Sequence, residues 1–307
     1  MNEYKYVIIG SGPAGISAAT AIREQNSNTK IAIVTEENFP YYYRPRLIDY
    51  IAGKCKFSDF VFYQDEWYKE NIIDLLFNFN VAKIDVVAKI IFSDKNETIK
   101  YDKLLVATGG KPFIPQDYSN LNPYTVRSKS DADNIIKLCI EKNSFCVVGG
   151  GLLGLEIAGA LAYRGKNVFV IEASSYPLPR QLDFEGGQFL SEKLEKTGMK
   201  LGFNKKVKQV NEKKLVFADE CSLDFEVLIL CTGIKPAIDF FIDTNIKVDK
   251  GIVVNDYFET SISDIFAAGD VCQHNNIVYG SWMPALEQGR LAGLNMAGIK
   301  TQYMSSK

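Results

Sequence analysis

The sequence lacks the cysteine pairs on which thiol-based redox enzymes and zinc sites depend. Its 307 residues include six cysteines, but no two of them form a CxxC or CxxxxC pair. Neither a dithiol relay nor a cysteine-based zinc site is therefore indicated. Because free cysteine packs like a small hydrophobic residue, we expect these thiols to be reduced and mostly buried, as in a cytoplasmic protein.

Histidine is nearly absent as well. The single one, His274, would have to serve any Ser-His-Asp or Cys-His mechanism, and no second histidine is available for a zinc site. We therefore expect His274 to be exposed or in a loop rather than catalytic, and we expect no metal.

No excess of positive charge and no secretion signal is present. Lysine and arginine number 35 against 37 acidic residues, so nucleic acid, which selects for positive charge, is not an expected partner. The N-terminus lacks the basic and apolar regions of a signal peptide. One apolar stretch, residues 145–163, could pass for a membrane helix, but it contains Glu156 and clustered glycines. A buried strand, turn and helix explains it better, and no membrane partner is expected.

A pattern of strand, glycine turn and helix occurs twice in a chain long enough for about two domains. Apolar residues 6–9 precede a turn at 10–15, and apolar residues 145–148 precede a turn at 149–154. Both turns match the GxGxxG fingerprint of dinucleotide binding, in which the glycines permit the tight turn, the approach of a pyrophosphate and close helix packing. The residues expected to contact the dinucleotides here are Gly10, Gly12, Pro13, Ala14 and Gly15 in the first copy and Gly149, Gly151, Leu152, Leu153 and Gly154 in the second.

An acid follows each turn at roughly the spacing of about 20 residues at which a carboxylate binds ribose hydroxyls. Glu36 lies 21 residues after Gly15, and Glu172 lies 18 residues after Gly154. A carboxylate at Glu172 would repel a 2′-phosphate, which favours NADH over NADPH. A solvated strand end is the alternative interpretation of Glu172. The sequence shows two dinucleotide sites and no recognisable set of residues for another substrate, which suggests that NADH reduces a flavin.

The sequence resembles the two-dinucleotide-domain flavoproteins of the glutathione reductase type along nearly all of its length. The resemblance is carried by residues 10–15, 101–109 and 260–271. It implies an α/β fold with two Rossmann-like domains, the NADH domain being inserted in the FAD domain. The implied division assigns residues 1–110 and 235–307 to the FAD domain and residues 111–234 to the NADH domain.

A finer resemblance, at residues 43–53, 178–183 and 282–290, is to the NADH:rubredoxin oxidoreductases and the flavin part of assimilatory nitrite reductases. It implies that Arg44 and Pro45 lie beside the isoalloxazine ring. Tyr41 to Tyr43 are equally compatible with a flavin contact or an aromatic core. The other cofactor-binding residues that the resemblance implies are Val81, Ala107, Thr108, Gly109, Arg127, Gly233, Gly269, Asp270, Trp282 and Met283.

The sulfur motifs of related flavoenzymes are missing. Disulfide reductases and thioredoxin reductases of this superfamily use cysteine pairs, and NADH oxidases or peroxidases use one cysteine near the first turn, where Arg44 and Pro45 stand here. The resemblance therefore implies that reduced flavin passes electrons directly to rubredoxin or a similar small iron–sulfur protein. The alternatives are an NADH oxidase or peroxidase, the flavin subunit of an NADH-dependent nitrite reductase, and a non-enzymatic FAD- and NAD-binding redox sensor.

Two departures from the family pattern stand out. Related ferredoxin reductases place a lysine after the RPxL segment to pair with the glutamate that matches Glu156, whereas Ile48 and Asp49 occupy this place here. A catalytic role for Glu156 near the nicotinamide is thus a hypothesis, the alternative being a packed helix residue. The chain also ends at Lys307, so a C-terminal interface domain is expected to be absent or truncated.

Overall fold

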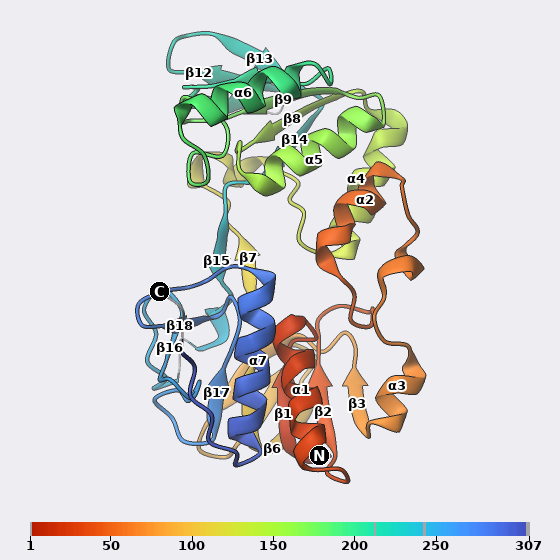
Figure 1. Cartoon of the computed structure of the whole chain (residues 1–307), viewed down its shortest axis with the longest axis vertical. Coiled ribbons are helices and arrows are strands. Elements are labelled where there is room, and N and C mark those ends of the chain that lie inside the picture. The colour runs from red at the N-terminus through yellow and green to blue at the C-terminus, as the bar shows by residue number, and fades with distance from the viewer. Residues whose placement is uncertain (1, 212, 242–243, 305–307) are drawn as a thin grey trace. The chain divides into compact units, whose positions relative to one another are not determined.

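The computed structural model describes residues 2–211, 213–241 and 244–304, and the chain forms two compact units (Figure 1). The sequence-based divisions near residues 110 and 234 lie next to two of the observed divisions. The first unit consists of Met1–Tyr42, Val61–Lys111 and Lys235–Lys307, and the second consists of Tyr43–Phe60 and Pro112–Ile234.

The first unit is built on a seven-stranded sheet in the order β3-β2-β1-β6-β5-β4, with β17 also paired to β6. Strands β1, β2, β3, β6 and β17 run parallel, and β4 and β5 form an antiparallel extension. The strands are β1 (Asn2–Ile9), β2 (Ile31–Val34), β3 (Ile73–Leu76), β4 (Val81–Asp85), β5 (Ile90–Ser93), β6 (Thr98–Val106) and β17 (Ile265–Ala267), and the helices are α1 (Pro13–Gln25), α3 (Asp65–Glu70) and α7 (Trp282–Met296).

The second unit repeats the parallel part of this sheet. Its order β10-β9-β8-β14 corresponds to β3-β2-β1-β6, and all of its pairs are parallel. The strands are β8 (Ser144–Val148), β9 (Asn167–Ile171), β10 (Lys200–Gly202) and β14 (Val227–Leu230), beside a small antiparallel sheet of β11 (Val207–Asn211), β12 (Lys214–Phe217) and β13 (Ser222–Asp224). The helices are α2 (Leu47–Ala52), α4 (Lys129–Glu141), α5 (Leu152–Tyr163) and α6 (Phe184–Glu195).

Short elements complete the chain. Strands β7 and β15 pair with each other, as do β16 and β18. Their bounds are β7 (Gly110–Pro112), β15 (Ile234–Pro236), β16 (Ile252–Val254) and β18 (Cys272–His274), and the 3₁₀ helices are η1 (Arg44–Arg46), η2 (Phe57–Phe60), η3 (Gln116–Leu121) and η4 (Asp239–Phe241).

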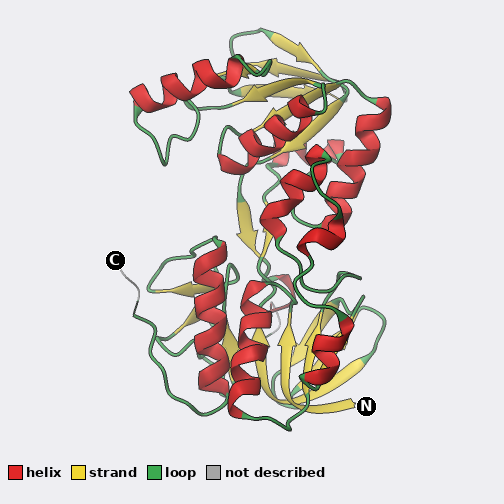
Figure 2. Ribbon diagram, turned by 45° about the vertical axis from the view of Figure 1, so that its right-hand side comes forward, coloured by secondary structure: helices red, strands yellow, loops and turns green. Residues whose placement is uncertain are grey.

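Apolar strands explain why both sheets are covered. All residues of β2 and β14 are buried, as expected for parallel strands with both faces covered. Figure 2 shows both sheets in yellow with red helices beside them. The predicted α/β fold with two Rossmann-like sheets is confirmed. Residues 145–163 form most of β8, a turn and α5, and no helix in the described residues is long and apolar enough to cross a membrane.

Segment 43–60 packs within the second unit, which the sequence-based division did not foresee. Helix α2 in this segment packs against α4 and α5. The Tyr50 hydroxyl donates to Asp133 Oδ1 at 2.8 Å, and the Arg164 guanidinium donates to the carbonyl of Ile51. Both contacts join residues at least 80 positions apart, so no local pattern could have revealed them.

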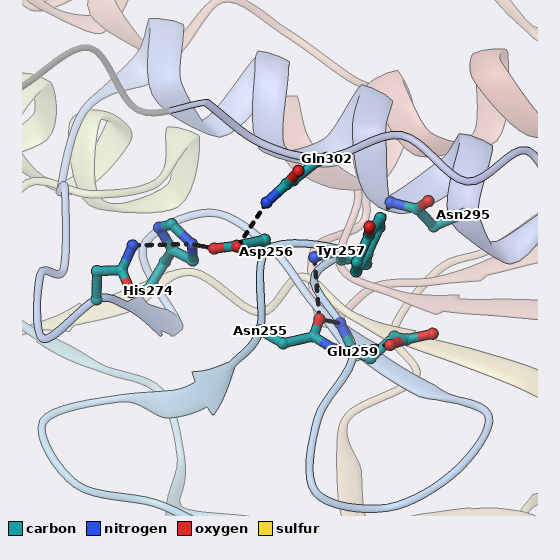
Figure 3. Close-up of polar contacts among 8 residues, drawn as sticks. Asn255, Asp256, Tyr257, Glu259, His274, Asn295 and Gln302 are labelled. Atoms are coloured by element: carbon teal, nitrogen blue, oxygen red, sulfur yellow. Dashed lines mark hydrogen bonds and ion pairs between the residues drawn. The ribbon is translucent and has the colours of Figure 1, made fainter.

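His274 is buried at the end of β18, so the expectation of an exposed or loop histidine was wrong. Its Nε2 lies 2.7 Å from Asp256 Oδ1, and Gln302 donates to the other oxygen of that carboxylate (Figure 3). These hydrogen bonds hold the pKa of Asp256 below its usual value. The Tyr303 ring meets the imidazole edge-on at 5.3 Å. Partners distant in sequence thus enclose a polar side chain that composition alone suggested would be solvated.

Helices α1 and α7 lie side by side (Figure 1), and their backbones approach closely at two glycines. A Cβ atom added to Gly289 would lie 2.1 Å from the carbonyl oxygen of Ala14, and one added to Gly293 would lie 2.5 Å from that of Ala18. Real Cβ atoms do not approach a backbone oxygen this closely. These two glycines therefore set the distance between the helices.

We predict that Gly289→Ala destabilises the protein by about 1–3 kcal/mol or more, because the methyl group forces the helices apart. The matched control is Gly159→Ala in α5, where an added Cβ meets no atom within 4 Å. Alanine should be neutral or stabilise there by up to about 1 kcal/mol, since glycine is a poor helix former. Urea unfolding followed by circular dichroism measures both effects, and equal midpoints for the two variants would contradict the packing argument.

Candidate functional site

The two glycine turns have the same backbone geometry. Gly10 has a φ of 110° and Gly149 a φ of 117°, a region that side chains rarely permit. An added Cβ would lie 2.3 Å from the carbonyl oxygen of Ala107 in the first turn and 2.4 Å from that of Cys231 in the second. Glycine is therefore required where each strand turns toward its helix. We call residues 10–15 and 149–154 the first and the second cradle.

The last glycine of each cradle brings the helix onto the turn. A Cβ on Gly15 would lie 1.9 Å from the carbonyl oxygen of Gly10, and a Cβ on Gly154 would lie 1.9 Å from that of Gly149. Helices α1 and α5 can begin so close to their strands because these positions carry no side chain.

The middle glycines leave space at the start of each helix. An added Cβ on Gly12 or Gly151 would meet no atom within 4 Å. Each of these residues is the N-cap of its helix, and neither cap makes a side-chain hydrogen bond. Each helix thus begins beside open space, where its first available N–H groups and the positive end of its dipole suit a pyrophosphate; Pro13, the first residue of α1, has no N–H. Both cradles fit a dinucleotide on this test.

The second cradle also exposes apolar side chains. Leu152 and Leu153, at the start of α5, are 56% and 39% exposed. Large apolar residues beside an open helix N-terminus suit a ligand with an apolar part, which agrees with the prediction that they contact a nucleotide.

Glu172 points toward the second cradle. Its carboxylate accepts hydrogen bonds from the backbone N–H groups of Gly150 at 2.7 Å and Ser174 at 2.8 Å. These two contacts orient a half-buried acid at the end of β9, where a ribose is expected. The carboxylate is therefore fixed rather than freely solvated, and its predicted ribose contact remains a prediction.

Thr35, not Glu36, occupies the corresponding place in the first cradle. The N–H of the first glycine donates to Val34 in one unit and to Ile171 in the other, at 2.8 Å in both, so the next residues correspond. Thr35 receives a 3.1 Å hydrogen bond from the Ser11 hydroxyl, whereas Glu36 is exposed one position further on. The spacing of about 20 residues after the turn could not decide which of these two neighbours lies at the strand end. The strand register does.

The ends of β6 and β14 close the two cradles in the same way. The N–H of Ala107 donates to Ile9 and that of Cys231 donates to Val148, both at 2.8 Å. Following them, the Thr108 hydroxyl donates to the carbonyl of Ala237 at 3.1 Å. The predicted segment 107–109 therefore begins beside the first turn, and Gly233 follows two residues after Cys231; their contacts with a cofactor remain predictions.

Residues 260–271, which carry part of the family resemblance and include β17, lie in the same unit as the first cradle. The N–H of Gly269, next to Asp270, donates to the Gln288 side chain at 2.9 Å, and Gln288 is fully buried. At the start of α7, Trp282 stacks on Tyr41 with 5.9 Å between ring centroids, while Met283 is 70% exposed. Tyr41 also stacks on Phe62, so its surroundings favour the aromatic core among the two interpretations.

The remaining predicted residues divide between the units. Val81 begins β4 in the first unit. Arg44 and Pro45 form part of η1 in the second unit, together with Arg127, whose backbone N–H donates to Asp131 just before α4. Their predicted flavin contacts remain predictions.

All six cysteines are free thiols, and burial disfavours the ionised form of five of them. Burial raises the pKa of Cys146 and Cys272 to about 12, so both stay protonated at neutral pH. Cys221 is exposed. Burial also raises the pKa of three other thiols, those of Cys55, Cys139 and Cys231.

Glu156 lies in α5 of the second unit near a second acid. Partial burial raises the pKa of its carboxyl group, and the negative charge of Asp49 in α2 raises it further. Asp49 itself lies 3.7 Å from the Arg46 guanidinium. Where related reductases are expected to place a lysine, which would lower the pKa of this carboxyl group, Asp49 carries the opposite charge and raises that pKa.

We predict that Asp49→Asn lowers the pKa of Glu156, because it removes the neighbouring negative charge and leaves the burial unchanged. Carboxyl carbon shifts measured by NMR across the acidic range report the titration, and Glu156→Gln identifies the signal. A midpoint that stays in place or moves upward in Asp49→Asn would refute this electrostatic account.

Comparisons with known proteins agree with this geometry. Residues 4–289 match the family model described as pyridine nucleotide-disulphide oxidoreductase. The chain is 35% identical over 306 residues to the NADH-rubredoxin oxidoreductase of Clostridium acetobutylicum, covering 99% of this chain and 77% of that protein. It is 34% identical to the NADH oxidase of Methanocaldococcus jannaschii (97% and 71% covered) and 33% identical to a nitrite reductase [NAD(P)H] of Bacillus subtilis, of which it spans 38%.

Solved structures show the same relationship. The crystal structure of NADH:rubredoxin oxidoreductase from Clostridium acetobutylicum superimposes with a TM-score of 0.86 at 33% identity, over 100% of this chain and 78% of that one. Putidaredoxin reductase, in its covalent complex with putidaredoxin, has the same fold, with a TM-score of 0.89 at 24% identity over 99% and 77% of the two chains.

Proposed function

The chain belongs to the pyridine nucleotide-disulphide oxidoreductase family, and on that premise we propose that it is an NADH-dependent FAD reductase that passes electrons to rubredoxin or a similar small iron–sulfur protein. The observation that carries the proposal is the pair of like-built cradles in one chain, each with an open helix N-terminus. The proposed electron acceptor is inferred from relatives whose names identify them as reductases of rubredoxin.

The first unit would hold FAD and the second NADH. A bound flavin accepts a hydride from the nicotinamide and releases the two electrons singly. The chain's own contribution would be to bind and orient: the N-termini of α1 and α5 would bind the pyrophosphates, and the Glu172 carboxylate would accept hydrogen bonds from the ribose hydroxyls of NADH. Asp270 is proposed to bind the ribityl chain of FAD. The reaction then depends mainly on positioning, since hydride transfer needs no proton donor from the protein.

Direct transfer to the acceptor, without sulfur chemistry, is supported by the thiols. A relay needs a thiolate, and the protonated state of the buried cysteines opposes one. Six free thiols also fit a reducing compartment, so we propose that the protein works in the cytoplasm.

An NADH oxidase is the second candidate, because the Methanocaldococcus jannaschii relative carries that name at 34% identity. The two candidates share both cofactors and differ in the acceptor. The sequence region in which oxidases of this family would place a reactive cysteine holds Arg44 and Pro45, which favours the iron–sulfur acceptor.

We predict that the FAD-loaded protein, reduced anaerobically with NADH, is reoxidised faster by rubredoxin than by oxygen. Stopped-flow absorbance of the flavin band measures each rate after mixing with rubredoxin, ferredoxin or oxygen separately. Faster reoxidation by oxygen would establish the oxidase instead, and failure of NADH to reduce the flavin would remove both candidates.

We also predict that alkylation with iodoacetamide at pH 7.5 leaves NADH-dependent turnover nearly unchanged, because at this pH thiols with raised pKa values carry little reactive thiolate. Mass spectrometry identifies the modified residues, with exposed Cys221 expected first. The Cys55→Ser variant is the control for the half-buried thiol. Loss of turnover in step with modification of any one cysteine would show that a sulfur relay operates.

A further inference from the structure

Besides the residues at the start of the helix, the two cradles differ at one pair of facing residues. After the first glycine, the first cradle has Ser11 where the second has Gly150. At the facing strand end, the first has Thr35 where the second has Glu172, as the hydrogen bonds of the first glycines establish. The backbone geometry of the two turns corresponds closely, and this pair is the difference that lies at the strand end where a ribose is expected.

In the second cradle the absence of a side chain at Gly150 is linked to the acid. A Cβ added to Gly150 would lie 3.0 Å from Glu172 Cβ and 3.1 Å from its Oε2. The same residue donates its N–H to Oε2 at 2.7 Å, while Ser174 donates to Oε1. A side chain at position 150 would therefore force Glu172 to shift by a few tenths of an ångström from the place where these backbone groups orient its carboxylate. Gly150 permits both the space and the hydrogen bond.

In the first cradle a serine side chain fills the space next to the strand end, and the strand-end residue carries no charge. The Ser11 and Thr35 hydroxyls are hydrogen-bonded at 3.1 Å, and both residues are buried. Thr35 Oγ1 also accepts the N–H of Glu37 at 3.3 Å. A serine with a short neutral partner thus replaces a glycine with a long acidic one.

The chemistry of the two dinucleotides explains why the strand-end residue should be neutral in one cradle and acidic in the other. The adenosine ribose of FAD has a free 2′-hydroxyl and no 2′-phosphorylated counterpart, whereas NADH has NADPH as a competitor. Excluding that competitor requires a negative charge held at the ribose, because specificity is a difference of affinities and a repulsive element supplies it. A fixed carboxylate is needed in the second cradle and not in the first.

We propose that Gly150 is a positioning residue for dinucleotide specificity: by leaving room for Glu172 and anchoring its carboxylate, it makes the second cradle reject 2′-phosphorylated nucleotides. The Ser11–Thr35 pair is the non-discriminating form of the same device. This inference rests on the proposed function of the second unit as the NADH site.

The test measures binding to the full-length, FAD-loaded protein by isothermal calorimetry, with ADP-ribose and 2′-phospho-ADP-ribose as probes. The wild type should prefer ADP-ribose by at least about tenfold, as an uncompensated like charge predicts. Gly150→Ser should lose most of this preference and bind ADP-ribose more weakly, because the displaced carboxylate no longer faces the ribose.

The double variant Gly150→Ser with Glu172→Thr recreates the first pair in the second cradle. It should bind ADP-ribose more tightly than Gly150→Ser alone and bind both probes with similar affinity. This coupling between the two positions is the signature of a shared role, since independent sites would show additive effects. Glu172→Thr alone supplies the fourth corner of the cycle.

Ser11→Gly is the matched control, because it makes the same kind of change in the other cradle. It should leave the preference between the two probes unchanged. Retained FAD in each variant shows that the chain is folded. An unchanged preference in Gly150→Ser, or additive effects in the double variant, would overturn the inference. If the wild type binds neither probe, the proposed function of the second unit fails instead.

Discussion

The contact on which the structure depends is the approach of the glycine backbone to the neighbouring strand at Gly10 and Gly149. A side chain at either position would collide with a carbonyl oxygen at the end of β6 or β14. Because the chain can turn there, the helix starts directly at the carboxyl end of its strand and presents free N–H groups. The proposed binding roles of the helix N-termini, of the strand-end residue Glu172 and of residues 260–271 all depend on this turn.

The sequence revealed this part because the constraint is local. Glycine spacing, apolar strands and the duplication predict both cradles and the α/β fold, and the structure repeats the strand order in both units. Local sequence patterns could not predict features that depend on strand register or on contacts between residues far apart in the chain. Thr35 and Glu36 are neighbours, and a spacing rule that tolerates a few residues cannot say which one faces the turn. Segment 43–60 and His274 depend on partners far along the chain.

Electrostatics separates this chain from its sulfur-using relatives. Burial keeps thiols such as Cys146 and Cys272 protonated, and an acid stands near Glu156 where related reductases would supply a lysine. The second cradle instead has a negative charge at Glu172, whose carboxylate is held in place by two backbone N–H groups. The resulting picture is of a protein whose residues hold and sort two nucleotides and leave the redox chemistry to them.

The central claim is that one chain binds two different dinucleotides at once, one in each unit. Native mass spectrometry of the purified protein, supplied with FAD and NAD⁺, tests it most directly. The account predicts a species with the mass of one chain plus one FAD plus one NAD⁺. Binding of a single dinucleotide, or displacement of FAD by NAD⁺ as its concentration rises, would contradict it.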